Sequence, residues 1–194
     1  MPRVSEAHLA ARREQIIAAA TRCFVRNGFH QSSMQDVIKE AGLSVGAFYR
    51  YFKSKDELIF AIAEEKVGII IASLERLLVR EPAPTLHEIF AEVLEQIDAN
   101  LSDDGPVRIA VQVWGEAAHD PELAAMVNGI YGRIRVAAVA LAGRLSPASD
   151  PVAIGPVILG LVQGYVLQRV LMGTVDREGY LAGIDALTAG YGQA

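Results

Sequence analysis

The side chains best suited to chemistry on another molecule lie between Ser33 and Lys55, in the stretch SMQDVIKEAGLSVGAFYRYFKSK. Arg50 can donate two hydrogen bonds at once to a guanine edge or to a phosphate. The hydroxyls of Tyr49 and Tyr51 suit phosphate oxygens, which position a protein on DNA but carry no sequence information. The chemistry predicted for this stretch, which we call the reader, is therefore recognition of a nucleic acid.

Two short helices joined by a tight glycine turn must position these side chains. Ser33 followed by Asp36 is close to a capping box, which predicts a helix that begins at the next residue. Gly42 can take a positive φ and end that helix. Ser44 can then cap a second helix, which we expect over about residues 45–51.

The second helix of the reader has one face for packing and another for contact. Phe48 and Phe52 are four residues apart, so they share a face that should pack on the first helix of the pair. Gly46 and Ala47 are small and would let the helix backbone approach base edges. A helical hairpin with an aromatic core is the alternative interpretation. The cap, the turn, the aromatic spacing and the flanking lysines together favour a helix-turn-helix that binds DNA.

The first part of the chain resembles the TetR family of bacterial transcriptional regulators. The matching residues are Ile16, Ile17, Ala19, Ala20, Phe24, Asn27, Gly28, Phe29, Ser33, Asp36, Ala41, Gly42, Leu43, Ser44, Gly46, Tyr49, Phe52, Ser54, Lys55 and Leu58. The resemblance implies a helix that supports the reader and two sets of DNA contacts. Those near bases or in the groove would be Gln35, Ser44, Val45, Gly46, Ala47, Tyr49 and Arg50, the last also able to reach phosphate. Those on phosphates would be Ser33, Tyr51, Lys53 and Lys55.

Charge is divided unevenly along the chain. Residues 1–58 hold nine Lys and Arg against six Asp and Glu, whereas the remainder holds nine against seventeen. A basic first part on an acidic body fits a DNA-contacting end and a body that avoids phosphate. Whether Arg3, Arg12 and Arg13 contact phosphate or stay solvated is left open by the sequence.

The single cysteine and the apolar segments bear on the compartment. Cys23 excludes an intrachain disulfide, fits a reducing cytoplasm, and is expected to be a buried apolar side chain. The first fifteen residues lack the apolar stretch of a signal peptide. The most apolar run, residues 152–167, contains Gln163 and several glycines, and it indicates a buried interface helix rather than a membrane span. We therefore expect a cytoplasmic protein without membrane contact.

Helical periodicity predicts an all-α fold of about nine helices in two domains. We expect the helix-turn-helix domain over residues 1–54 and a helical effector-binding and dimerisation domain over residues 55–194. The expected helices cover about residues 9–26, 34–41, 45–51, 55–79, 85–101, 107–118, 121–145, 151–172 and 176–190. Pro156 should delay or kink the eighth of these.

The eighth helix carries two apolar stripes, more than a single domain of this size hides easily. The resemblance implies that this helix and the next pair with their copies in a homodimer, with Val157, Leu161, Gln168 and Met172 at the interface. Two readers about one DNA turn apart, ~34–36 Å, would read a palindromic operator. The alternative is that the eighth helix is simply the core of a monomer.

A small-molecule effector pocket is implied by the resemblance alone. Its candidate residues are Phe90, Leu94, Trp114, Glu116, Met126, Tyr131 and Tyr165, each of which has core packing or solvation as its plainer role. Because these residues are mostly apolar, we expect a hydrophobic or aromatic effector, with Glu116 available to a cationic group. An effector that favours a DNA-incompetent spacing of the readers would release the operator.

Other function classes have little support in the sequence. His8, His30, His87 and His119 lack metal-ligand spacing, and no phosphate-binding glycine loop or nucleophile motif is present. The sequence therefore predicts no enzyme, no cofactor and no metal site. A non-specific architectural DNA-binding protein and an activator, rather than a repressor, are the open alternatives.

Overall fold

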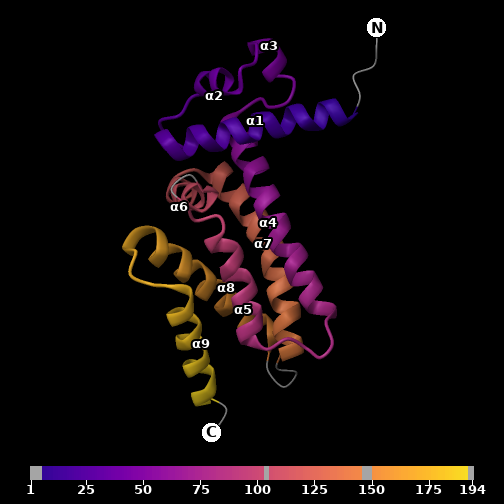
Figure 1. Ribbon diagram of the computed structural model, residues 1–194, viewed down its shortest axis with the longest axis vertical. Coiled ribbons are helices and arrows are strands. Elements are labelled where there is room, and N and C mark those ends of the chain that lie inside the picture. Colours follow the sequence, from indigo (N-terminus) through magenta and orange to yellow (C-terminus); the bar gives the residue numbers. More distant parts are fainter. Residues whose placement is uncertain (1–5, 103–104, 146–149, 192–194) are drawn as a thin grey trace. The chain divides into compact units, whose positions relative to one another are not determined.

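The computed structural model describes residues 6–102, 105–145 and 150–191, and within these ranges it is helical without a strand (Figure 1). Its α-helices are α1 (Glu6–Asn27), α2 (Met34–Ala41), α3 (Val45–Phe48), α4 (Lys55–Val79), α5 (Leu86–Asp98), α6 (Pro106–Ala117), α7 (Pro121–Leu145), α8 (Pro151–Leu167) and α9 (Arg177–Tyr191). A π-helical turn, η1 (Gln168–Met172), follows α8 directly. The predicted all-α fold is confirmed.

The contacts divide the chain into two compact units. Unit 1 consists of Met1–Glu65 and Ser102–Met126, and unit 2 of Lys66–Leu101 and Val127–Ala194. Both α4 and α7 continue across the division, and α6 belongs with the reader rather than with α5. The sequence predicted two domains that are each continuous in the chain, divided between residues 54 and 55. That domain division stays a prediction.

The core of unit 1 forms where α1 packs against α2. Its side chains recur at helical spacing along α1, which is why one face of this helix is buried. The buried apolar residues of α1, the reader and the start of α4 include Ile16, Ala20, Cys23, Phe24, Val37, Ile38, Phe48, Phe52 and Leu58. Phe24 and Phe29 meet edge to face, with ring centroids 5.4 Å apart. Cys23 is fully buried, as expected, and burial raises the pKa of its thiol.

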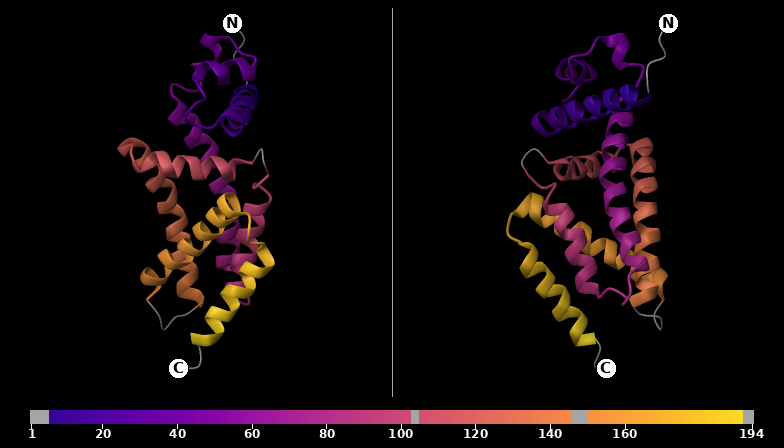
Figure 2. Two further views of the ribbon diagram at one scale, coloured as in Figure 1. Left: turned by 90° about the vertical axis from the view of Figure 1, so that its left-hand side faces the viewer. Right: turned by 45° about the vertical axis from the view of Figure 1, so that its right-hand side comes forward.

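In unit 2, α5 lies beside α8 and α9 (Figure 2). One face of α5 is apolar and buried, because Ile89, Phe90, Val93, Leu94 and Ile97 recur at helical spacing. A capping box formed by Thr85 and Glu88 begins this helix one residue later than the sequence suggested.

Close contacts hold other helices of unit 2 together. On α8, Gly155 lies so near α7 that a Cβ built on it would be 2.5 Å from Val139 Cγ2. The guanidinium of Arg144, on α7, donates to the carbonyls of Leu78 and Arg80, which satisfies carbonyls at the end of α4.

The eighth helix keeps its predicted bounds, residues 151–172, but Pro156 does not delay its start and its last turn is not α-helical. It begins at Pro151, where the Asp150 carboxylate accepts from the Val152 amide at 2.9 Å, and it continues through Pro156. It becomes π-helical at Gln168 and ends at Gly173, whose φ of 65° is left-handed. Glycine accepts that conformation without the strain of a Cβ.

Candidate nucleic-acid interface

Both helices of the reader are capped as their sequences indicate. The Ser33 Oγ accepts from the Asp36 amide at 3.2 Å, and the Asp36 carboxylate accepts from the Ser33 amide at 2.9 Å. The Ser33 hydroxyl also donates to the Asp36 carboxylate at 2.6 Å, and this bond, together with the one from the Ser33 amide, holds the pKa of Asp36 below its ordinary value. Gly42 ends α2 with a φ of 64°, and Ser44 Oγ accepts from Ala47 at the start of α3.

Aromatic packing fixes the inner face of α3. Phe48 is fully buried and Phe52 is 4% exposed, as their spacing predicts. The Arg13 guanidinium covers the ring of Phe52, 5.5 Å from its centroid. This helix is shorter than the expected 45–51, because the amides of Tyr51 and Phe52 both donate to the Phe48 carbonyl and tighten the chain into a turn.

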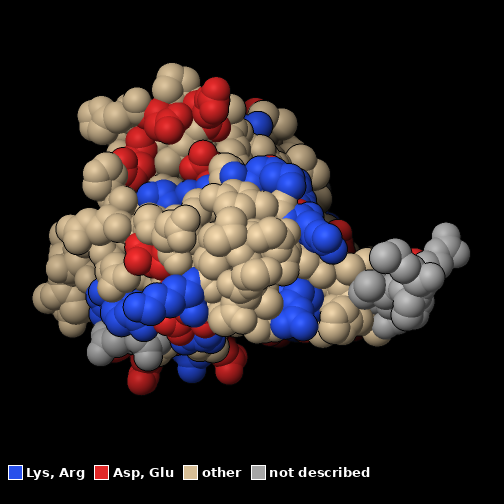
Figure 3. Space-filling model, turned by 90° about the horizontal axis from the view of Figure 1, so that it is seen from above, with Lys and Arg blue, Asp and Glu red and all other residues tan. Residues whose placement is uncertain are grey.

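The opposite face of the reader is open to solvent. The exposed members of the predicted contact set are Ser33, Gln35, Ser44, Val45, Gly46, Arg50 and Lys53, whereas Ala47, Tyr49, Tyr51 and Lys55 are half-buried. Val45 is 49% exposed, and its apolar side chain suits contact with a thymine methyl group. Figure 3 shows the molecule from above the view of Figure 1. On this side, Lys and Arg side chains form separate groups around an area without charged residues.

Lys55 is engaged within the chain in this structure, and its predicted phosphate contact stays a prediction. Its ammonium donates to the carbonyl oxygens of Phe29 (2.8 Å), His30 (3.2 Å) and Ser32 (3.2 Å). An ammonium has three protons, and each one has an acceptor here, so none is left for a phosphate. The charge also lies 4.4 Å from the centroid of the Phe29 ring. Lys53 differs, because its ammonium donates to the Tyr49 carbonyl and keeps further donors for a phosphate.

Polar side chains that the sequence analysis did not single out tie α1 to α2. Gln15 donates to the Ala41 carbonyl at 2.7 Å. The Glu40 carboxylate pairs with Arg22 at 2.8 Å and with Arg26 at 3.1 Å, and hydrogen bonds from both lower its pKa. Arginines at a four-residue spacing on α1 were visible in the sequence, but their acceptor on another helix was not.

The arginines near the start of the chain have different positions. Arg13 stacks on Phe52, and Arg12 donates to Gln15 at 2.8 Å. Arg3 lies outside the described residues. Part of the charge that the sequence left available for phosphate is therefore engaged within unit 1.

The seven predicted effector-pocket residues fall into both units. Trp114, Glu116 and Met126 belong to unit 1, whereas Phe90, Leu94, Tyr131 and Tyr165 belong to unit 2. Phe90, Leu94 and Tyr165 are at most 1% exposed and act as core side chains. The Tyr165 hydroxyl donates to Asp98 at 2.7 Å, and burial with this hydrogen bond raises its pKa.

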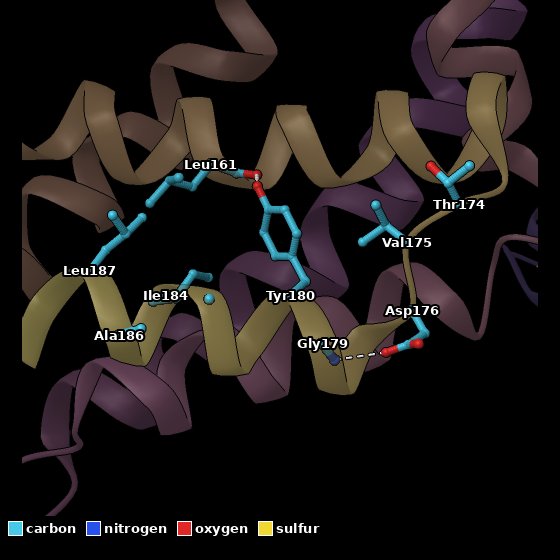
Figure 4. A pocket seen from close by; sticks show the side chains of 10 residues that line it. Leu161, Thr174, Val175, Asp176, Gly179, Tyr180, Ile184, Ala186 and Leu187 are labelled. Atoms are coloured by element: carbon cyan, nitrogen blue, oxygen red, sulfur yellow. Dashed lines mark hydrogen bonds between the residues drawn. The ribbon is translucent and has the colours of Figure 1, made fainter.

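The described pocket of unit 2 lies elsewhere, between α8 and α9 (Figure 4). Its volume is about 660 Å³, and its lining residues are Leu161, Thr174, Val175, Asp176, Gly179, Tyr180, Gly183, Ile184, Ala186 and Leu187. The Tyr180 side chain crosses from α9 to α8, where its hydroxyl donates to the Leu161 carbonyl at 2.6 Å. None of the seven predicted residues lines this pocket, but Leu161, a predicted dimer-interface residue, does.

Apolar side chains are exposed along α8, η1 and α9. Val157 is 62% exposed, Leu171 and Met172 are each 65% exposed, and Leu187 is 59% exposed. Of the predicted interface residues, Leu161 and Gln168 are half-buried. Pro121–Leu145 and Pro151–Met172 are long and apolar enough to cross a membrane by length and composition alone, a test that core and interface helices also pass. Only 22% of the apolar window in each is buried within the described chain.

The reader is a pair of capped helices with a buried aromatic face and an exposed polar face, and α1 supports it. This arrangement defines the chain as a helix-turn-helix DNA-binding protein. The family profile "Bacterial regulatory proteins, tetR family" matches residues 16–62, and "BetI-type transcriptional repressor, C-terminal" matches residues 82–191, more than half of the chain. The chain therefore belongs to the TetR family of transcriptional regulators.

Individual relatives agree with this assignment. A transcriptional repressor of Mycobacterium tuberculosis is 46% identical over 76 residues, which span 39% of this chain and 41% of that protein. The chain thus covers less than half the length of that relative. The transcriptional regulator UidR of Escherichia coli K12 is 29% identical over 92% of this chain and 91% of its own length.

Solved structures share the whole fold. The structure of Salmonella enterica GusR has a TM-score of 0.77 at 21% identity and covers 97% of this chain and 98% of its own. The regulator FadR of Bacillus subtilis, solved in complex with stearoyl-CoA, has a TM-score of 0.72 at 23% identity, with 87% and 95% coverage. At these identities the similarity shows the fold alone.

Proposed function

We propose that the chain is a homodimeric repressor that binds a palindromic operator and is released from it by a small hydrophobic effector. The observation that carries the DNA-binding part is the open face of the reader. Val45, Gly46 and Arg50 are exposed, whereas the aromatic residues on the other face of the helix are buried. These three residues are therefore not needed for core packing and are free to contact DNA. Two such readers, one DNA turn apart, would read two half-sites.

Selection of bound sequences from a random duplex pool at near-physiological salt tests operator recognition. A palindrome among the recovered sequences supports a dimeric, sequence-specific regulator. Its Kd should then be at least roughly 10³-fold lower than that for random DNA. Equal affinity for both would instead indicate a non-specific architectural protein. Reporter transcription with the selected site beside a promoter separates repression from activation.

The exposed apolar side chains of α8, η1 and α9 support the dimer. Their surface adjoins the open pocket at Leu161 and Leu187, and a second copy would bury both. Val157→Arg should give a monomer with unchanged helix content and weaker operator binding. Val79→Arg, at a valine that is 79% exposed on α4, is the matched control. A Val157→Arg protein that stays dimeric would place the interface elsewhere.

The effector class follows from the apolar body and from the fold shared with FadR. Stearoyl-CoA is the first probe, with free coenzyme A as its polar control, because that neighbour was solved with the acyl thioester. Release of the operator by stearoyl-CoA alone supports a hydrophobic effector. If neither probe releases the operator but a cationic compound such as choline does, the result would point instead to Glu116 as the recognition group.

A further inference from the structure

The loop of residues 28–32 joins α1 to the reader and sets where α2 begins. Gly28 turns the chain with a φ of 83°. Ser32 then closes the turn, because its amide and its hydroxyl both donate to the Gly28 carbonyl, at 3.2 Å and 2.8 Å. The next residue, Ser33, is the N-cap of α2. Any change in this loop is therefore passed directly to the first turn of the reader.

One side of the loop is held from α4. The Lys55 ammonium donates to three carbonyls of the loop, as described above. These bonds orient the carbonyl side of the peptide groups. The amide of Phe29 needs an acceptor of its own, because buried backbone donors are costly to leave unpaired.

That acceptor comes from α6, a helix 83 residues further along the chain. Gln112 Oε1 accepts from the Phe29 amide at 2.7 Å in a part-buried bond. The same oxygen lies 3.7 Å from the position that a Cβ on Gly28 would occupy. Glu116, one turn further along α6, has its Oε1 3.5 Å from Nδ1 of His30. Two successive turns of α6 therefore face the loop, and all of these residues belong to unit 1.

We propose that Gln112 is a positioning residue of the reader, which fixes the loop before Ser33 to α6 through the Phe29 amide. This proposal rests on the proposed DNA-binding function and adds the route by which α6 acts on it. A shift of α6 that breaks the bond leaves the loop held by Lys55 alone. The start of α2 then samples positions in which Ser33 and Gln35 no longer meet DNA together.

Two substitutions separate the hydrogen bond from the shape of the side chain. Gln112→Leu removes the acceptor, whereas Gln112→Glu keeps an oxygen at the same reach. His119→Ala, at an exposed position beyond the end of α6, is the control. Against a duplex selected with the wild-type protein, Gln112→Leu should raise Kd about tenfold, because DNA binding must then order a loop that the lost hydrogen bond held in place in the free protein. Gln112→Glu and His119→Ala should stay within about twofold.

Amide hydrogen exchange without DNA gives a readout that does not depend on operator binding. In Gln112→Leu, exchange should rise at Phe29 and in the first turn of α2 and stay unchanged in α5 of unit 2. A wild-type protein that binds no DNA would sink the proposed function, while this exchange pattern would still decide the role of Gln112. Unchanged exchange in α2, or an equal loss of affinity in Gln112→Leu and Gln112→Glu, would overturn the positioning role.

Discussion

Replacing Gly46 with alanine should stabilise the protein and weaken its binding to DNA. Gly46 is the second residue of α3, and no heavy atom lies within 4 Å of the position that a Cβ would take. Its φ is not left-handed either, so the free protein has room for a methyl group. Glycine is less favourable than alanine within a helix by up to about 1 kcal/mol. The free energy of unfolding should therefore rise by a fraction of that amount.

The opposite effect on DNA binding follows from the exposed position of Gly46 beside Val45. If this face approaches base edges, an added methyl group must be fitted into a close contact. Overpacking of this kind costs about 1–3 kcal/mol, or roughly 5–150-fold in Kd for each reader. In a dimer with two readers on one operator, this free-energy cost would apply to each reader.

Urea unfolding and fluorescence anisotropy on a selected duplex would measure the two effects. Gly115→Ala on α6 is the matched control, because its Cβ would also meet no atom within 4 Å and it lies outside the reader. It should gain stability without loss of affinity. A Gly46→Ala protein with wild-type affinity would refute the reasoning, since it would show that the exposed face of α3 does not approach DNA closely. Lower stability would refute the packing part.

Three further predictions follow from single contacts. Lys55→Met should lower the free energy of unfolding by about 2 kcal/mol in urea and leave the salt dependence of operator binding unchanged, whereas loss of a phosphate contact would reduce that slope by about 0.9. Gly155→Ala should cost about 1–3 kcal/mol by crowding Val139, and Val139→Ala in the same chain should restore part of it; additive losses would contradict the close contact. The amide of Thr85 and the Arg80 guanidinium lower the pKa of Glu88 from 4.5 to about 2, so its stabilising effect is complete above pH 4.5 and is lost as the pH falls towards 2. The melting temperature of Glu88→Gln should fall less steeply than that of the wild type across this range, and parallel curves would count against the assignment.

Local features of the fold were predictable because their causes lie within a few residues. A capping box needs only Ser33 and Asp36, and a left-handed helix end needs only a glycine at position 42. The burial of Phe48 and Phe52 follows from a four-residue spacing on one helical face. The sequence by itself therefore determined the reader, its exposed face and the all-α fold.

The contacts that only the tertiary structure decided join residues far apart in the chain. The charge of Lys55 suits a phosphate contact. Its ammonium nevertheless donates to three carbonyls of a loop more than twenty residues earlier in the chain. Gln112 carried no signal in the sequence, because a glutamine becomes a positioning group only when folding brings an unpaired amide to it. The predicted effector residues are mostly large and apolar, which core side chains are as well, and the fold places Phe90, Leu94 and Tyr165 in the core. A side chain's type limits which bonds it can make, but packing decides which partners are within reach.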